Sequence, residues 1–258
     1  MKILVIGNSH TPALLRGFAL LAPQCPDVSL TAYAHYHRFF GQFEPDEAAG
    51  RIRMKHPAIR RRFIKTHGGD GSFRPLDYDM CIIIGGYWLW AGLALGRFSE
   101  AFERAIIDEH IETMHPMVLL RKIRAVSDIP VLIVCNPFMA SRAGMLADAQ
   151  AEPNNGAALI NAVLGPRYDA RLVTQPPETL LYPRQTKLEY AIGENMWGTW
   201  KGCDFKPYLY DDMMHMNTTY GALLMRRILR DLGQDIGEVA LPAAEGHLPY
   251  AQKTMPAL

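Results

Sequence analysis

The chain has 258 residues, with 27 Lys and Arg against 26 Asp and Glu, so that its formal net charge is +1. Hydrophobic residues make up 49% and charged residues 21% of the sequence, which excludes a disordered chain, and the balanced charge excludes a dedicated nucleic-acid-binding protein. The sequence has no apolar run near the roughly 18 residues of a membrane span, and its four scattered cysteines form neither a disulfide framework nor a zinc-ligand pattern. We therefore expect a cytoplasmic protein with no membrane span, folded as one domain over residues 1–258 in which 242–258 form an extended arm.

Strand and helix patterns alternate along the chain. Continuous apolar runs, typical of strands buried between two layers of helices, cover residues 2–6, 29–34, 80–84, 130–135 and, more weakly, 170–174. Helical patterns cover 12–21, 45–65, 98–126, 143–164 and 218–232. This alternation predicts an α/β fold with a parallel sheet.

Two intermediate segments invite a functional reading. The glycine-rich segment 67–72 does not link a strand directly to a helix, so we interpret it as a turn rather than a phosphate-binding loop. Seven Lys and Arg within 51–65 are interpreted as a solvated helix face, with an anion-binding rim as the alternative.

Candidate catalytic residues follow the first strand and precede the last helix. In an open α/β sheet, ligands bind beyond the carboxyl ends of the strands. The first strand ends in Gly7-Asn8-Ser9-His10, which places Ser9 near a helix start, where backbone N–H groups favour negative charge. Asp212 and His215 are three residues apart, so one turn of chain can bring the carboxylate against the imidazole. The pattern predicts a serine nucleophile with a histidine base.

The two end motifs resemble those of the SGNH/GDSL hydrolase family. Its members begin with a strand ending in Gly-Asp-Ser and finish with Asp-x-x-His before a terminal helix; here Gly7-Asn8-Ser9 and Asp212-Met213-Met214-His215 occupy those places. The resemblance spans essentially the whole chain and implies a flavodoxin-like three-layer α/β/α sandwich around a central five-stranded parallel sheet. It also implies that Ser9 is the nucleophile, His215 the general base and acid, and Asp212 its orienting partner, with no metal or organic cofactor.

The middle of the chain departs from the family pattern. Members carry a glycine after strand two and Gly-x-Asn-Asp after strand three, which complete the oxyanion hole with a backbone N–H and an asparagine amide. Gly41 matches the first element, whereas Gly85-Gly86-Tyr87-Trp88 places Tyr87 where the asparagine should be. The backbone N–H groups of Ser9 and Gly41 are the expected donors, with the Tyr87 hydroxyl or the Asn136 amide as alternatives for the third. The expected substrate pocket contains His10, Gly86 and Trp88.

These features predict an ester hydrolase or an acyl- or acetyltransferase whose substrate is a small-molecule or glycan ester. The alternative is a non-catalytic ligand- or glycan-binding protein that kept the scaffold after losing the oxyanion asparagine. A flavodoxin-like nucleotide binder is disfavoured because the sequence has neither Gly-x-Gly-x-x-Gly nor a Walker loop. We expect no metal site and no nucleic-acid partner, and the sequence leaves the oligomeric state open.

Overall fold

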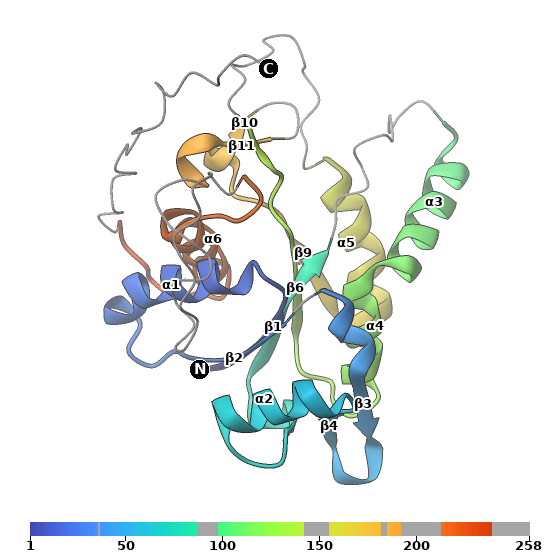
Figure 1. The fold of residues 1–258 in the computed structure, drawn as a ribbon. Helices are drawn as coiled ribbons and strands as arrows, with labels where there is room; N and C mark the ends of the chain where they lie inside the picture. Colours follow the sequence, from blue (N-terminus) through green and yellow to red (C-terminus); the bar gives the residue numbers. More distant parts are fainter. Residues whose placement is uncertain (36, 87–97, 142–154, 182–184, 192–212, 239–258) are drawn as a thin grey trace, which may run out of the picture.

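The computed structural model describes residues 1–35, 37–86, 98–141, 155–181, 185–191 and 213–238. At its centre lies a five-stranded sheet in the order β2-β1-β6-β7-β9 (Figure 1), in which all four neighbouring pairs are parallel. The strands are Lys2–Gly7 (β1), Ser29–Ala34 (β2), Met80–Gly86 (β6), Val131–Cys135 (β7) and Ala170–Val173 (β9). The predicted strands are therefore confirmed, and their order is that of a flavodoxin-like sheet.

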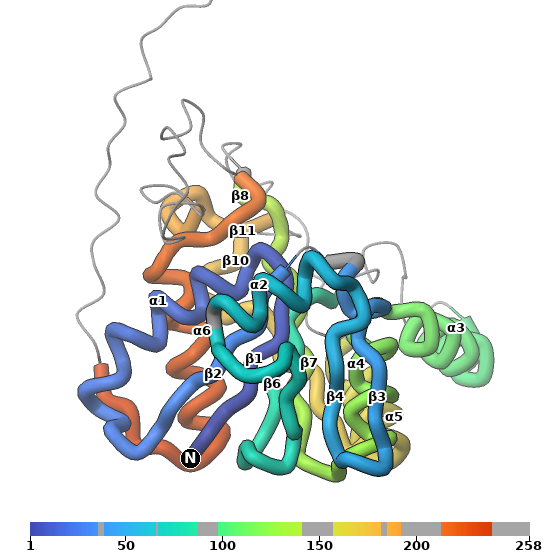
Figure 2. Tube along the Cα trace, turned by 60° about the horizontal axis from the view of Figure 1, so that its bottom comes forward, coloured from blue at the N-terminus to red at the C-terminus, as the bar shows by residue number. Residues whose placement is uncertain are grey.

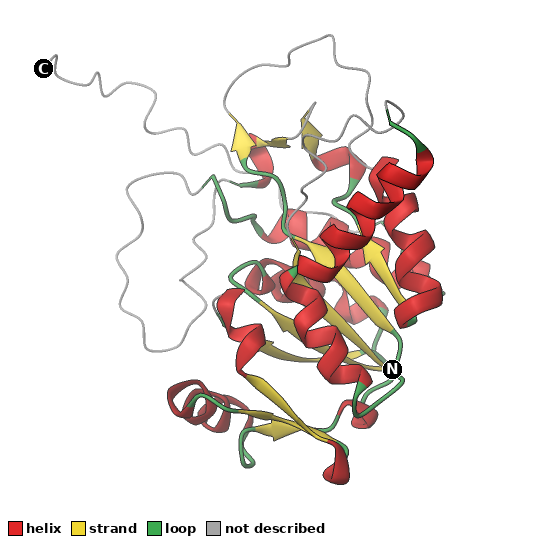
Figure 3. Cartoon of the chain, turned by 90° about the vertical axis from the view of Figure 1, so that its right-hand side faces the viewer, coloured by secondary structure: helices red, strands yellow, loops and turns green. Residues whose placement is uncertain are grey.

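Helices cover both faces of the sheet, as Figure 3 shows from the side. One face carries α1 (Thr11–Leu21) and α6 (Thr218–Asp231), and the other carries α4 (His115–Arg124) and α5 (Asn155–Tyr168), with α3 (Glu100–Thr113) packed outside them. Successive residues of β1 alternate between the two cores: Ile3 and Val5 pack with α1 and α6, whereas Leu4 and Ile6 face the opposite core. The three-layer α/β/α sandwich is thus present.

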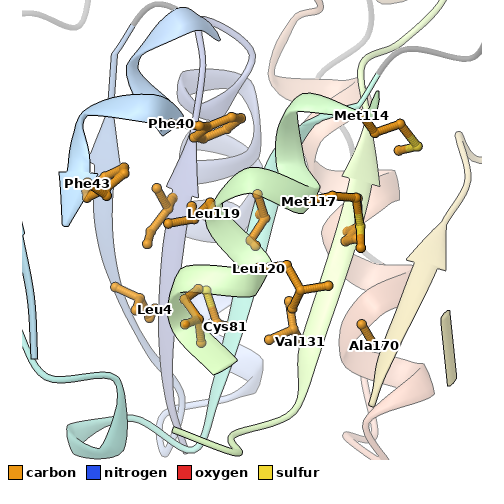
Figure 4. Close-up of a cluster of buried hydrophobic side chains, with 14 of the residues drawn as sticks. Leu4, Phe40, Phe43, Cys81, Met114, Met117, Leu119, Leu120, Val131 and Ala170 are labelled. Carbon is orange, nitrogen blue, oxygen red and sulfur yellow. The ribbon is translucent and has the colours of Figure 1, made fainter. Parts of the chain in front are cut away.

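The larger of the two cores joins the sheet to α4 (Figure 4). Leu119 and Leu120 of α4 are fully buried against Leu4 of β1 and Val131 of β7. Burial of each such aliphatic side chain contributes about 1.5–3 kcal/mol. Because both faces of the sheet are covered, its strands are continuous apolar runs rather than alternating ones.

The expected helix over 45–65 is wrong in its first half. A separate antiparallel sheet is formed there by Phe43–Asp46 (β3), Arg51–Met54 (β4) and Ser72–Phe73 (β5). The helix α2 (Pro57–His67) begins only at Pro57. In β4, buried Ile52 and Met54 alternate with more exposed arginines, so the pattern has the period of a strand. The segment 67–72 is a turn between α2 and β5, as expected.

Asp46 of β3 contacts the basic residues of β4 across the hairpin. Its carboxylate caps the short 3-10 helix Glu47–Ala49 by accepting a hydrogen bond from the Ala49 N–H, and it pairs with Arg51 and Arg53 of the next strand. These ion pairs hold two of the basic residues that the sequence placed on a helix face.

The expected helix over 98–126 is two helices, α3 and α4, that are separated at Met114, whose backbone is extended. Pro116 is the cause, because within one continuous helix its ring would remove a hydrogen bond and clash with the preceding turn. In α5 the described part runs four residues past the expected end at 164, and 143–154 lie outside the described residues. The last helix, α6, agrees with the prediction.

A third small sheet, which the sequence did not predict, is formed by Leu180–Leu181 (β10), Gln185–Lys187 (β11) and Ala140–Ser141 (β8). Within the described ranges, no helix is long and apolar enough to cross a membrane. The cytoplasmic location and the single-domain organisation stay predictions, and the expected arm at 242–258 lies outside the part of the chain that the structure describes.

Candidate active site

The structure brings Ser9 and His215 together, although they are 206 positions apart in the sequence. The Oγ atom of Ser9 lies 2.8 Å from Nε2 of His215, which is hydrogen-bonding distance. Both side chains are only partly buried, so a substrate can reach them. A serine hydroxyl in contact with an imidazole is the arrangement in which histidine can take the serine proton. Asp212, the expected third member, lies outside the described residues.

Asn8 fixes the turn that presents Ser9. Its backbone N–H donates to the Ile84 carbonyl of the neighbouring strand at 3.2 Å, which extends β1 to the edge of the sheet. Its backbone carbonyl accepts from the Thr11 N–H at 3.1 Å, and its side-chain Oδ1 accepts from the His10 N–H at 3.0 Å. Asn8 therefore holds the chain on both sides of Ser9, between the end of β1 and the start of α1.

His215 lies between two anchored points of a loop. Before it, the Met213 carbonyl accepts from the Ala140 N–H of β8 at 2.8 Å. After it, the Asn217 N–H donates to the Tyr190 carbonyl at 2.8 Å, and the Asn217 side chain accepts from the Tyr220 N–H and so caps α6. The small sheet and the cap together set the position of the imidazole.

A second histidine contacts the pair. The rings of His10 and His215 have centroids 5.0 Å apart and are tilted by 36°. His10 also lines a cavity of about 10 Å³, room for roughly one water molecule. Cys135 and Tyr220 line the same cavity; burial raises the pKa of both the thiol and the phenol. The Cys135 thiol therefore stays protonated at neutral pH and does not compete as a nucleophile.

Two of the expected oxyanion donors, Gly41 and Asn136, lie in different parts of the fold. Gly41 lies in the 3-10 helix His37–Gln42 beside α4, where its carbonyl accepts from Lys122 Nζ at 3.0 Å. Asn136 follows β7 and is buried, and its Oδ1 accepts from Asn8 Nδ2 at 2.8 Å. Gly86, an expected pocket residue, ends β6 and accepts the Asn136 N–H at 2.7 Å. Tyr87 and Trp88 lie outside the described residues, so their roles stay predictions.

Sequence reasoning missed the role of Asn8. The residue stands where the family has aspartate, and the motif alone assigns it no role. An available signal was its position three residues before a helix start, since asparagine side chains commonly hydrogen-bond the backbone two residues on, here at His10. Within the described residues, no group of three or more His, Cys, Asp or Glu side chains could hold a metal ion.

The sequence matches no protein-family model and no curated protein. Among solved structures, the chain is similar to the periplasmic domain of a lipopolysaccharide acetyltransferase from Salmonella ser. Paratyphi A, with a TM-score of 0.46, 11% identity, and coverage of 90% of this chain and 83% of that chain. It is also similar to a putative arylesterase from Agrobacterium tumefaciens str. C58 (TM-score 0.37, 16% identity, 90% and 98% coverage). An inhibitor-bound aryl esterase of M. smegmatis gives a TM-score of 0.40 at 13% identity, with 90% and 99% coverage.

The α/β/α class itself rests on the strand order and on the helices that cover both faces of the sheet.

Proposed function

We propose that the chain is a serine hydrolase or O-acyltransferase of the SGNH type that acts on an ester-linked acyl group. The observation that carries the proposal is the 2.8 Å contact between Ser9 Oγ and His215 Nε2 at the carboxyl end of the parallel sheet. This is where an open α/β fold binds its ligands. The motifs at both ends of the chain and the names of the similar structures support the same class of reaction.

In the proposed first half-reaction, Ser9 Oγ attacks the carbonyl carbon of the ester while His215 Nε2 takes the hydroxyl proton. The tetrahedral intermediate then collapses, the alkoxide leaves with the proton from His215, and the acyl group remains on Ser9. Asp212 is the proposed acceptor for the other ring nitrogen, which fixes the tautomer of His215. These steps use no metal and no organic cofactor.

In the second half-reaction, a water molecule or the hydroxyl of an acceptor attacks the acyl-enzyme, with His215 again acting as base. Hydrolysis and transfer differ only in this acceptor. We propose a small-molecule or glycan ester as the acyl donor, with His10, Gly86 and Trp88 at the pocket. The backbone N–H groups of Ser9 and Gly41 are proposed donors to the oxyanion, each worth about 2.7–4 kcal/mol in the transition state.

A fluorophosphonate probe tests the proposal, because it reacts with activated serine hydroxyl groups. We expect one labelled peptide, containing Ser9, when the treated chain is analysed by mass spectrometry. The labelling should disappear in Ser9→Ala and in His215→Ala. Ser127→Ala is the matched control, because Ser127 lies in a turn after α4 where its hydroxyl accepts from the Ile129 N–H, and labelling should persist in it.

A folded chain that the probe does not label would contradict the proposal. It would favour the alternative, a non-catalytic ligand- or glycan-binding protein on the same scaffold.

A further inference from the structure

Asn136 has a buried side-chain amide whose oxygen accepts a hydrogen bond while its NH₂ group has no partner among the described residues. Its side chain is only 5% exposed, and its Oδ1 accepts the hydrogen bond from Asn8 Nδ2. Its own Nδ2 is buried and has no hydrogen-bond partner among the residues that the structure describes. A buried donor without a partner has lost its hydrogen bonds to water without replacing them, and such groups are rare enough to require an explanation.

The orientation of this amide follows from which groups can donate and which can accept. The His10 backbone N–H can only donate, so the Asn8 atom that faces it at 3.0 Å is the oxygen. The other end of the Asn8 amide is then its NH₂ group, which also can only donate. Asn136 must therefore turn its oxygen toward Asn8 and its NH₂ group away from it.

The pair of amides lies beside the nucleophile, because Asn8 directly precedes Ser9. To reach Asn8, the Asn136 side chain extends from the end of β7 past β6, where Gly86 accepts the Asn136 N–H. Gly85 leaves the necessary space: a Cβ atom there would lie 2.8 Å from the Phe40 ring and 3.5 Å from Asn8 Nδ2. Its φ of +152° is also one that side-chain-bearing residues rarely adopt.

We propose that Asn136 Nδ2 is the side-chain donor of the oxyanion hole and that Asn8 is a positioning residue that aims it. The inference rests on the proposed function. As the bond from Ser9 Oγ to the carbonyl carbon forms, the C=O π pair moves onto the oxygen, and Nδ2–H donates a hydrogen bond to that oxyanion without losing its proton. On collapse the pair returns to the C=O bond and the leaving group departs.

The inference explains two departures from the family pattern together. Tyr87 stands in place of the usual oxyanion asparagine, and Asn8 stands in place of the usual aspartate. A carboxylate at position 8 accepts hydrogen bonds at both oxygens, so it would attract the NH₂ group of Asn136 and leave the Asn136 carbonyl facing the oxyanion. In this chain an asparagine at position 8 is therefore required for the NH₂ group of Asn136, rather than its carbonyl oxygen, to face the oxyanion.

The test compares three variants in the hydrolysis of p-nitrophenyl acetate by the full chain. Asn136→Ala removes the donor, and Asn8→Asp reverses the amide while still accepting from the His10 N–H. Each should lower kcat about 10²- to 10³-fold, the effect of losing one oxyanion donor, with little change in KM. Asn8→Ala removes the hydrogen bond that holds Asn136 Oδ1 without reversing the Asn136 amide, so its kcat should fall less than that of Asn8→Asp.

Stability separates a positioning role from a structural one. Asn8→Asp keeps both contacts of the side chain and should melt at a higher temperature than Asn8→Ala, although its kcat is lower. A merely structural role would rank the two variants in the same order in both measurements. Asn161→Asp is the matched control, because the Asn161 amide bridges the N–H and C=O of Leu172 in β9. It should lower the melting temperature and leave kcat unchanged.

If Asn136→Ala does not fold, Asn136→Asp replaces it, since that side chain still accepts from Asn8 Nδ2 but cannot donate. Unchanged kcat in the Asn136 and Asn8→Asp variants, with activity still abolished by Ser9→Ala, would overturn the inference and leave the proposed function standing. Equal activity in wild type and Ser9→Ala, or a wild type that neither turns over the ester nor reacts with a fluorophosphonate, would overturn both.

Discussion

Gly17 of α1 and Gly221 of α6 meet backbone to backbone. A methyl group on Gly17 would overlap the backbone of Gly221 and Ala222, and one on Gly221 would overlap the carbonyl group of Ala13. The two helices lie side by side (Figure 2), and they begin shortly after Ser9 and His215 respectively. Their close crossing therefore sets the distance between the two site residues.

The first prediction concerns this crossing. Gly221→Ala should push α6 away from α1 and shift His215 relative to Ser9. Overpacking costs about 1–3 kcal/mol of the free energy of unfolding, and a shift near 1 Å can lower turnover about 10²-fold. Urea denaturation and ester hydrolysis measure the two effects. Gly165→Ala in α5, where a Cβ meets nothing within 4 Å, is the control and should leave turnover intact. Wild-type turnover in Gly221→Ala would show that the crossing does not set the site.

The second prediction concerns the proposed catalytic pair, Ser9 and His215. Ser9→Ala and His215→Ala should each lower turnover about 10⁴- to 10⁶-fold, and the double variant should be little worse than either, because the two residues act as a unit. Asp212→Asn should be milder, since it disturbs only the tautomer and orientation of the imidazole. Steady-state kinetics on one ester measure all four variants. Additive losses in the double variant would argue against a shared proton transfer.

The third prediction concerns Lys122 of α4. Its Nζ donates to the carbonyl oxygens of Phe40 at 3.4 Å, Gly41 at 3.0 Å and Phe43 at 2.6 Å, and so ties that segment to α4. Lys122→Met should lower the free energy of unfolding by about 1.5–3 kcal/mol, the range for hydrogen bonds to a charged group.

If Gly41 donates to the oxyanion, the same variant should also lower kcat, because the segment that carries Gly41 loses its anchor. Lys55→Met, at an exposed lysine, is the control for loss of one positive charge. A Lys122→Met chain with lowered stability but full kcat would remove Gly41 from the proposed oxyanion hole.

The fourth prediction concerns the pH dependence of stability. Burial lowers the pKa of His110 of α3 below its ordinary value near 6.5. The unfolded chain therefore takes up a proton at this histidine before the folded chain does, so stability is full above pH 6.5 and is lost as the pH falls below it. His110→Leu should weaken this loss, in urea denaturation between pH 8 and about pH 5.5. Parallel curves for wild type and variant would assign the acid sensitivity to other groups.

The predictability of the fold differs between segments for physical reasons. The runs at 3–6 and 80–84 are apolar at every position because helices cover both faces of the sheet, and that composition is visible in the sequence. The alternation of polar and apolar residues in Arg51–Met54 covers only four residues, which is too few to distinguish a strand from one turn of helix. The sequence pattern therefore extends the neighbouring helix over this strand. Pro116 is a helix-breaking residue that the sequence displays, but the apolar periodicity on both sides of it predicts one long helix instead of α3 and α4.

The candidate site divides in the same way. Ser9 and His215 are recognisable because each lies in a short motif at a fixed place relative to a strand or a helix. The contact between Asn8 and Asn136 joins residues 128 positions apart. It depends on the register of β1, β6 and β7 and on the space at Gly85, neither of which one sequence displays.

The separation of 206 positions between Ser9 and His215 also sets the order of events during synthesis. At about 5–20 residues per second, a ribosome makes the imidazole roughly 10–40 s after the serine. Until α6 emerges, the face of α1 that contains Ala13 and Gly17 lacks the helix that packs on it, and the hydroxyl of Ser9 lacks its proposed base. A nascent or truncated chain that lacks α6 therefore exposes an apolar helix, which chaperones and proteases can recognise, while its serine stays unreactive. Under the proposed mechanism, reactivity toward an ester thus marks chains whose synthesis has passed α6.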